Sequence, residues 1–192
     1  MKPGFYYYLV ASLPELSFDR PTPITTKDFL ELCSEHLPAA SCRLLAETDL
    51  FQSAASPARL GVLNIWFERE HLLRNELARL RAQRLGWDVT LHLRSTGRDA
   101  DLAVVAERIL GNESPRAAED ELDRARWTFL DGLEFGHYFD LESLALYWLK
   151  LRLLERRAVF NKERGREKLR AFVALPHEMT RQACAAAPEA LP

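Results

Sequence analysis

Residues 57 to 85 carry the signals of a helix at both ends and an apolar stripe between them. Ser56 before Pro57 is typical of an N-cap followed by a first helical position, and Gly86 stands where a chain leaves a helix. Apolar residues recur along this segment at spacings of three, four or seven, at Val62, Trp66, Leu73, Leu77 and Leu80. Because the arginines fall mostly on the remaining surface, we expect one long helix with a single packing face.

A second long helix is predicted from residue 141 to about residue 172. Asp140 can cap its first turn, and the leucines that follow cover most of the helix circumference, which indicates the most buried helix of the fold. Asn161 and Gly165 are expected to kink or interrupt it, at a cost of about 1 kcal/mol for the glycine. We predict that this helix packs antiparallel to the helix at 57 to 85.

Shorter helices are expected to cover these two, each with a capping residue at its start: Thr25, Asp99 and Ser114. Strand signals are weak, because clear alternation is confined to Val89, Leu91 and Leu93. We therefore predict an all-α (mostly α) protein, a helical bundle built on two long antiparallel helices. Residues 1 to 175 are expected to form a single helical domain, and residues 176 to 192 a partly disordered C-terminal tail.

Composition excludes several classes of protein. With 192 residues, 47% of them hydrophobic, the chain can bury one core without help from disulfides or metals. Its net charge of -2 gives no overall attraction to phosphates, which argues against nucleic-acid binding. Nowhere do 18 apolar residues run together, so we expect no membrane span, and the short aromatic opening closed by Pro14 is not expected to be a signal peptide. The odd number of cysteines, at Cys33, Cys42 and Cys184, is typical of a reducing cytoplasm and favours core or incidental thiols.

Charge is segregated along the chain. Residues 113 to 142 hold nine acids and three bases, whereas residues 150 to 170 hold nine bases and three acids. Packing of the two blocks against each other would neutralise them, with a small net energy for each exposed pair. The alternative is that the basic block, with Arg156 and Arg157, presents a docking strip to an acidic partner or to anionic lipid headgroups.

Two Glu-x-x-His spacings are the only arrangement that points to catalysis, since the glycine-loop, zinc-protease and serine-hydrolase signatures do not occur. Glu68 with His71 and Glu134 with His137 each place a carboxylate and an imidazole on one helical face, as ferritin-like di-iron bundles do. Gly136, however, is expected to end the helix inside the second pair. We therefore interpret both histidines as structural or interfacial, and keep a di-iron carboxylate oxidoreductase as the alternative function.

Aromatic side chains give the best candidates for a binding surface. Three consecutive tyrosines near the start are suited to an interface that is partly apolar and partly exposed to solvent, although core packing is the simpler interpretation. A second aromatic cluster surrounds the Gly-His turn near residue 137, where it indicates a packed helical corner or a hot-spot patch. The partner-binding candidates are Tyr6, Tyr7, Tyr8, Trp127, His137, Tyr138, Arg156 and Arg157. We assign no catalytic, cofactor-binding or metal-binding residue and expect no enzymatic activity.

Several segments resemble an uncharacterised bacterial family: residues 6 to 14, 23 to 25, 126 to 127 and 136 to 142. The resemblance covers most of the chain to about residue 175. Members of that family are typically encoded inside gene clusters for V-type (archaeal/vacuolar-type) ATP synthases. The resemblance implies a non-catalytic subunit, coupler or assembly factor that contacts other subunits of that rotary complex. It also implies a cytoplasmic location at the inner face of the membrane.

A weaker similarity links the chain to the socket-like C subunit (d in eukaryotes), which joins the central stalk of V/A-type ATPases to the membrane ring. That subunit also begins with a tyrosine-rich segment, and residues 29 to 37 are similar to its second helix. The present chain is much shorter and has no threefold internal repetition. The similarity implies a connector role, and it leaves open whether protons or sodium ions drive the associated machine.

Overall fold

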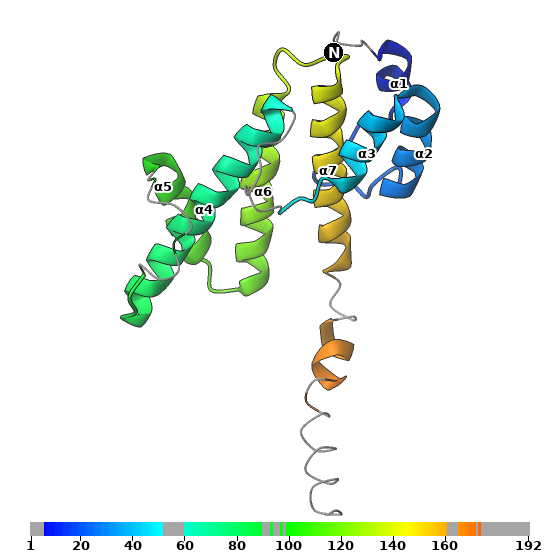
Figure 1. Ribbon diagram of the computed structural model, residues 1–192. Helices are drawn as coiled ribbons and strands as arrows, with labels where there is room; N and C mark the ends of the chain where they lie inside the picture. Colours follow the sequence, from blue (N-terminus) through cyan, green and yellow to red (C-terminus); the bar gives the residue numbers. More distant parts are fainter. Residues whose placement is uncertain are drawn as a thin grey trace, which may run out of the picture. The chain divides into compact units, whose positions relative to one another are not determined.

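The computed structural model describes residues 6–51, 60–89, 93, 97, 99–160, 165–171 and 173. Within these ranges the chain contains helices and no strand, which confirms the all-α class. The seven labelled helices are α1 (Tyr7–Ser12), α2 (Thr26–His36), α3 (Ala39–Glu47), α4 (Gly61–Leu85), α5 (Ala100–Leu110), α6 (Pro115–Leu133) and α7 (Leu141–Val159), shown in Figure 1. No helix among the described residues is both long enough and apolar enough to cross a membrane.

The chain divides into two compact units, Met1–Glu155 and Arg156–Pro192. The boundary falls inside the last turns of α7. In the second unit the described residues include a further helical stretch at 165–171. The tail expected from residue 176 onward lies outside the described residues.

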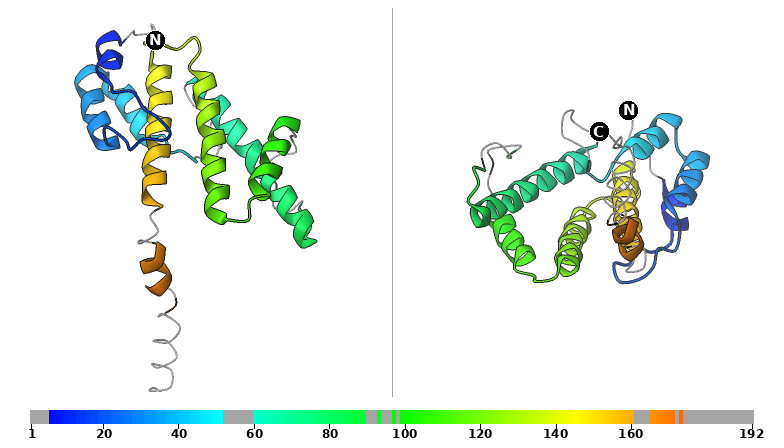
Figure 2. Two further views of the ribbon diagram at one scale, coloured as in Figure 1. Left: turned by 180° about the vertical axis from the view of Figure 1, so that it is seen from behind. Right: turned by 90° about the horizontal axis from the view of Figure 1, so that it is seen from below.

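The centre of the first unit is α7. Its leucines after Leu141 are all buried, on every side of the helix, which confirms the prediction that this would be the most buried helix. Figures 1 and 2 show α1 to α3 on one side of α7, and α6 with α4 on the other side. An apolar circumference dictates this position, because a helix that is hydrophobic all round must be covered all round.

The long helix α4 contributes to two separate apolar clusters, so its expected apolar stripe packs against two sets of helices. Val62, Leu63 and Trp66 belong to the main core around α7. Leu73 and Leu77 instead belong to a smaller cluster with α5 and α6. One straight stripe serves both clusters because the helix, at 25 residues, extends past the main core.

The two long helices begin at the same end of the unit, so the expected antiparallel pairing between them is wrong. Glu142, in the first turn of α7, accepts hydrogen bonds from the backbone N–H groups of Gly61 at 3.0 Å and Val62 at 2.8 Å. The carboxylate therefore caps α4, whose N-cap residue Leu60 offers no side-chain acceptor. Both helices run downward from this point in Figure 1, and the helix antiparallel to α7 is α6.

Helix boundaries differ from the expected ones at two places. Helix α4 begins at Gly61, and the expected cap at Ser56 and Pro57 lies outside the described residues. Helix α7 ends at Val159, where the chain leaves the helix before Asn161.

Candidate functional site

The turn at residues 134 to 140 joins α6 to α7 and carries several of the predicted residues. Helix α6 ends at Leu133, three residues before the expected end at Gly136, whose φ of 91° is a left-handed conformation within the turn. Asp140 then caps α7, because its Oδ1 accepts from the backbone N–H of Ser143 at 2.8 Å. Its Oδ2 lies 2.8 Å from Nδ1 of His137, so the same carboxylate fixes the imidazole ring.

Aromatic side chains are exposed around this turn and at the first turn of α1. We use the name aromatic patch for the exposed aromatic residues of these two segments, Tyr7, Tyr8, Phe135, Tyr138 and Phe139. Phe135 is 88% exposed and Tyr8 is 74% exposed. The two segments are joined, because the backbone N–H of Tyr6 donates to the carbonyl of Phe139 at 2.6 Å and the rings of Tyr7 and Phe139 lie 4.7 Å apart. The fold therefore brings the candidates Tyr6 and Tyr7 into contact with Phe139, the neighbour of the candidate Tyr138.

A groove of about 800 Å³ lies beside the patch, between the segment at residues 13 to 19, α6 and the first half of α7. Its walls include the buried rings of Phe18 and Trp127, whose centroids are 5.7 Å apart. The hydroxyl of Tyr147 donates to the carbonyl of Pro14 at 2.8 Å and ties the segment to α7. We call this cavity the α6–α7 groove.

Lys150 is the most deeply placed charge in the groove. It is only 6% exposed, and its Nζ contacts Asp131 and lies 2.5 Å from Oε1 of Glu134. The same ammonium group lies 5.0 Å from the centroid of the Trp127 ring, within the range of a cation–π interaction. Lys150 therefore links the basic and acidic blocks of the sequence, although Arg152, from the same basic block, pairs with Asp49 outside the acidic block.

The rim of the groove is acidic. Four carboxylates line it, from Glu15, Asp19, Asp131 and Glu134. Two cations accompany them: Lys150, and Arg124, whose Nη2 lies 3.1 Å from Asp19. The lining therefore carries more carboxylates than Lys and Arg side chains.

The four residues of the di-iron alternative do not converge. Glu68 is exposed on α4, and Nε2 of His71 is buried with no hydrogen-bond partner among the described residues. Glu134 and His137 lie in a turn, engaged with Lys150 and Asp140. Within the described ranges no group of three or more His, Cys, Asp or Glu side chains could hold a metal ion.

The other partner-binding candidates lie in three different places: the aromatic patch, the groove and the second unit. Tyr7, Tyr8 and Tyr138 are exposed in the aromatic patch, whereas Tyr6 is half-buried and Trp127 forms a wall of the groove. Arg156 and Arg157 belong to the second unit, where the guanidinium of Arg156 lies 4.9 Å from the centroid of the Phe160 ring.

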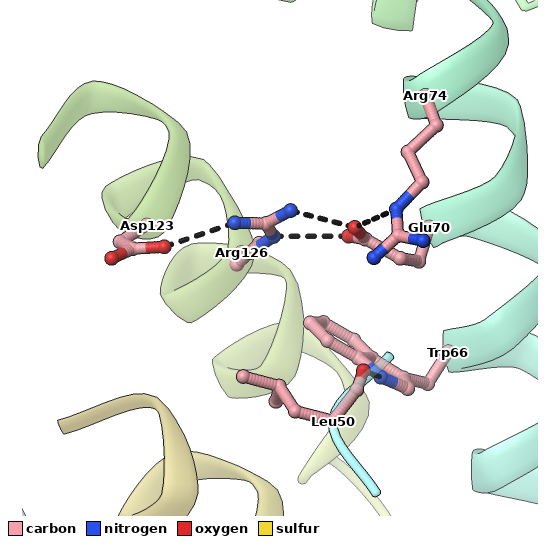
Figure 3. A network of polar contacts seen from close by, with 6 residues as sticks. All are labelled: Leu50, Trp66, Glu70, Arg74, Asp123 and Arg126. Carbon is pink, nitrogen blue, oxygen red and sulfur yellow. Dashed lines mark hydrogen bonds and ion pairs between the residues drawn. The ribbon is translucent and has the colours of Figure 1, made fainter. Parts of the chain in front are cut away.

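Sequence reasoning missed a buried charge network between α4 and α6, shown in Figure 3. Arg126 donates to both carboxylate oxygens of Glu70, at 2.6 and 3.0 Å, and to Asp123 at 3.0 Å. Nε of Arg74 donates to the same Glu70 carboxylate at 2.9 Å. Burial acts to lower the pKa of Arg126, but the hydrogen bonds and charges of Glu70 and Asp123 raise it above its ordinary value. The network is fully paired and structural.

Two weak acids, the buried Cys33 and the half-buried Tyr147, predict how stability depends on pH. Burial raises the pKa of the Cys33 thiol from 9.0 to about 12, and burial raises the pKa of Tyr147 from 10.0 to about 12. Above about pH 9 the unfolded chain releases protons that the folded chain keeps, so the free energy of unfolding should fall as pH rises toward 12. Urea unfolding at a series of alkaline pH values measures this slope.

The double variant Cys33→Ala with Tyr147→Phe should show a shallower loss of stability with pH than the unmodified chain. Leu13→Ala, which removes no titratable group, should keep the original slope. Parallel profiles for all three proteins would contradict the assignment. Cys42 is half-buried with its pKa also raised by burial, and Cys184 lies outside the described residues.

Residues 100–179 match a family described as a protein of unknown function (DUF2764). The matched region contains α5, α6, the turn at 134 to 140 and α7, and therefore two walls of the groove. No curated protein and no solved structure matches the chain.

Proposed function

We propose that this chain is a non-catalytic partner-binding protein, a subunit or assembly factor of a V-type rotary ATP synthase. The aromatic patch is the observation that supports the binding role most directly. Aromatic side chains are enriched at interfaces because they bury much apolar surface and keep a polar edge. Phe135 and Tyr138 project from a turn held by the hydrogen bond from the His137 N–H to the Glu134 carbonyl and by the Asp140 cap, so little conformational entropy is lost when a partner covers them.

The polar groups of the groove also favour binding over catalysis. Lys150 is paired with Asp131 and Glu134, and His137 is paired with Asp140. These contacts hold α6, the turn and α7 in one arrangement. A rigid end that carries exposed aromatic rings is suited to fixing the geometry of a complex through hot-spot contacts.

The identity of the partner rests on the family resemblance. Within the rotary complex, the finer proposal is a connector between the central stalk and the membrane ring. The core around α7 would give such a connector the stiffness needed to transmit force between its ends.

Affinity purification of the tagged full-length chain from cells that contain the V-type complex tests both parts of the proposal. We expect ATPase subunits to be recovered with the unmodified chain and lost, by about tenfold or more, with the variant Tyr8→Ser, Phe135→Ser, Tyr138→Ser. The matched control is Trp87→Ser, because Trp87 is 64% exposed but lies just after α4, outside the patch.

The two possible failures of this experiment are distinguishable. Absence of every ATPase subunit from the sample with the unmodified chain would contradict the V-type assignment. Equal recovery by the patch variant and by Trp87→Ser would contradict the role of the aromatic patch. Far-UV circular dichroism of each variant establishes that the fold is retained.

A further inference from the structure

The second unit has a net charge opposite to that of the first. Residues 156 to 192 hold eight Lys and Arg and four Asp and Glu residues, a net charge of +4. Residues 1 to 155 hold 18 Lys and Arg and 24 Asp and Glu residues, a net charge of -6. The small net charge of the whole chain is therefore the sum of an acidic unit and a basic unit. Because salt screens charges beyond about 10 Å, a partner of the second unit meets its local positive charge.

The bases of the helical stretch at 165–171 can reach a partner from solvent. Arg166, Lys168 and Arg170 are all exposed, and none of them takes part in an ion pair with another residue in the described ranges. Glu167 is the one acid within this stretch. By contrast, the bases that line the α6–α7 groove are already paired with carboxylates. The positive charge of the helical stretch is therefore not used inside the described part of the fold.

Apolar side chains share a helical face with two of these bases. Residues three, four and seven positions apart lie on one face of a helix, which places Leu169 and Val173 beside Arg166 and Arg170. Leu169 is 62% exposed and Val173 is 56% exposed. Val159, at the end of α7 in the same unit, is also exposed. Exposed apolar residues next to bases are typical of helices that bind at a membrane surface.

An anionic lipid surface fits this face better than a folded acidic protein does. A protein would have to match the shape of a surface on which bases and apolar side chains are interleaved. A lipid surface is fluid, so apolar side chains enter it while the long basic side chains extend to the phosphates of the headgroups. Each Lys or Arg close to such a surface strengthens binding by about fivefold.

We propose that the helical stretch at 165–171 and 173 binds the surface of an anionic membrane. Leu169 and Val173 enter the headgroup region, and Arg166 and Arg170 pair with lipid phosphates. Of the two partners that the sequence leaves open for the basic block, this inference selects the lipid headgroups. It does not depend on the identity of the protein partner, because the aromatic patch belongs to the first unit.

Co-sedimentation of the full-length chain with lipid vesicles tests the inference. We expect binding to phosphatidylcholine vesicles that contain about 30% phosphatidylglycerol, and no binding to vesicles of phosphatidylcholine alone. The double variant Arg166→Gln, Arg170→Gln should bind the anionic vesicles about tenfold more weakly. The charge-matched control Arg43→Gln, Arg81→Gln removes two exposed bases of the first unit and should bind within about twofold of the unmodified chain.

A second double variant, Leu169→Ser, Val173→Ser, tests the apolar part of the contact. It leaves every base in place and should bind the anionic vesicles about fivefold more weakly or worse. The matched control Ile65→Ser, Val104→Ser replaces side chains of the first unit that are 49% and 66% exposed, and its binding should be unchanged. Far-UV circular dichroism of the free variants establishes that their helical content is retained.

Several results would overturn the inference. Equal sedimentation with both kinds of vesicle, or with neither, would contradict recognition of an anionic surface. Undiminished binding by Leu169→Ser, Val173→Ser would reduce the contact to charge alone. Release of the chain from the anionic vesicles by poly-glutamate at equal charge concentration would identify an acidic protein as the better partner.

Discussion

Replacement of Arg126 by methionine is expected to lower the free energy of unfolding by about 3 to 5 kcal/mol. Arg126 is 6% exposed and makes three hydrogen bonds, two of which join α6 to Glu70 of α4, while the third goes to Asp123 on its own helix. Without it, the carboxylates of Glu70 and Asp123 stay buried, and Glu70 keeps only the partly exposed Arg74. The loss of stability arises because these carboxylates are left buried without their partner. Replacing every member of the network by apolar residues leaves no such charge and can be harmless. Urea unfolding followed by circular dichroism measures the change.

Arg124→Met is the matched control for this prediction. Arg124 lies on the same helix and is paired with Asp19, but its side chain is 55% exposed, so its loss should cost less than about 1 kcal/mol. The triple variant Glu70→Leu, Asp123→Leu, Arg126→Met should recover much of the stability lost in Arg126→Met. Equal destabilisation by Arg124→Met and Arg126→Met would contradict the assigned role of the network.

Replacement of Trp148 by alanine should cost about 3 to 5 kcal/mol, because it opens a cavity in the middle of the main core. Trp148 lies on α7, is 2% exposed, and stacks on Phe29 of α2 with 5.6 Å between ring centroids. Its Nε1 donates to the carbonyl of Thr48 at 2.9 Å, just after α3. One side chain therefore holds α2 and the end of α3 against α7.

Trp148→Phe separates the hydrogen bond from the packing. Phenylalanine keeps an aromatic ring in the core but leaves the Thr48 carbonyl without its donor, so we expect a loss of about 1 to 3 kcal/mol. Trp87→Ala removes an exposed tryptophan and should change stability by less than about 0.5 kcal/mol. A similar loss from Trp87→Ala and Trp148→Ala, in urea unfolding at one pH, would be incompatible with this account of the core.

Local features of the fold were predictable because their causes lie within one helical turn. Thr25 and Asp28 form the expected reciprocal capping box, and Asp99 and Ser114 accept from the backbone N–H groups of the turns that follow them. Gly86 adopts the left-handed conformation expected after α4. In each case the side chain or the missing Cβ acts on a backbone group a few residues away.

The candidate site was predictable only in part. The exposed tyrosines and the aromatic turn were identified as binding candidates from their composition, and the structure joins them through Tyr6 and Phe139. The groove was not foreseen, because its lining comes from three separate segments. In the sequence, Lys150 is one of nine bases in a charged block, and nothing distinguishes it from the others. Its position in the groove became evident only from its contacts with Asp131 and Glu134.

The sequence by itself determined the helical class, the capping residues Thr25, Asp99 and Ser114, and the burial of α7, since all three follow from the order of neighbouring residues. Only the tertiary structure decided which helices meet. Glu142 caps a helix that begins 81 residues earlier, and Arg126 pairs with a glutamate 56 residues away. Periodicity says which face of a helix is buried but not what covers it, because many partners offer similar apolar area. The choice among them is made by long-range contacts such as these, which form only once the chain has folded.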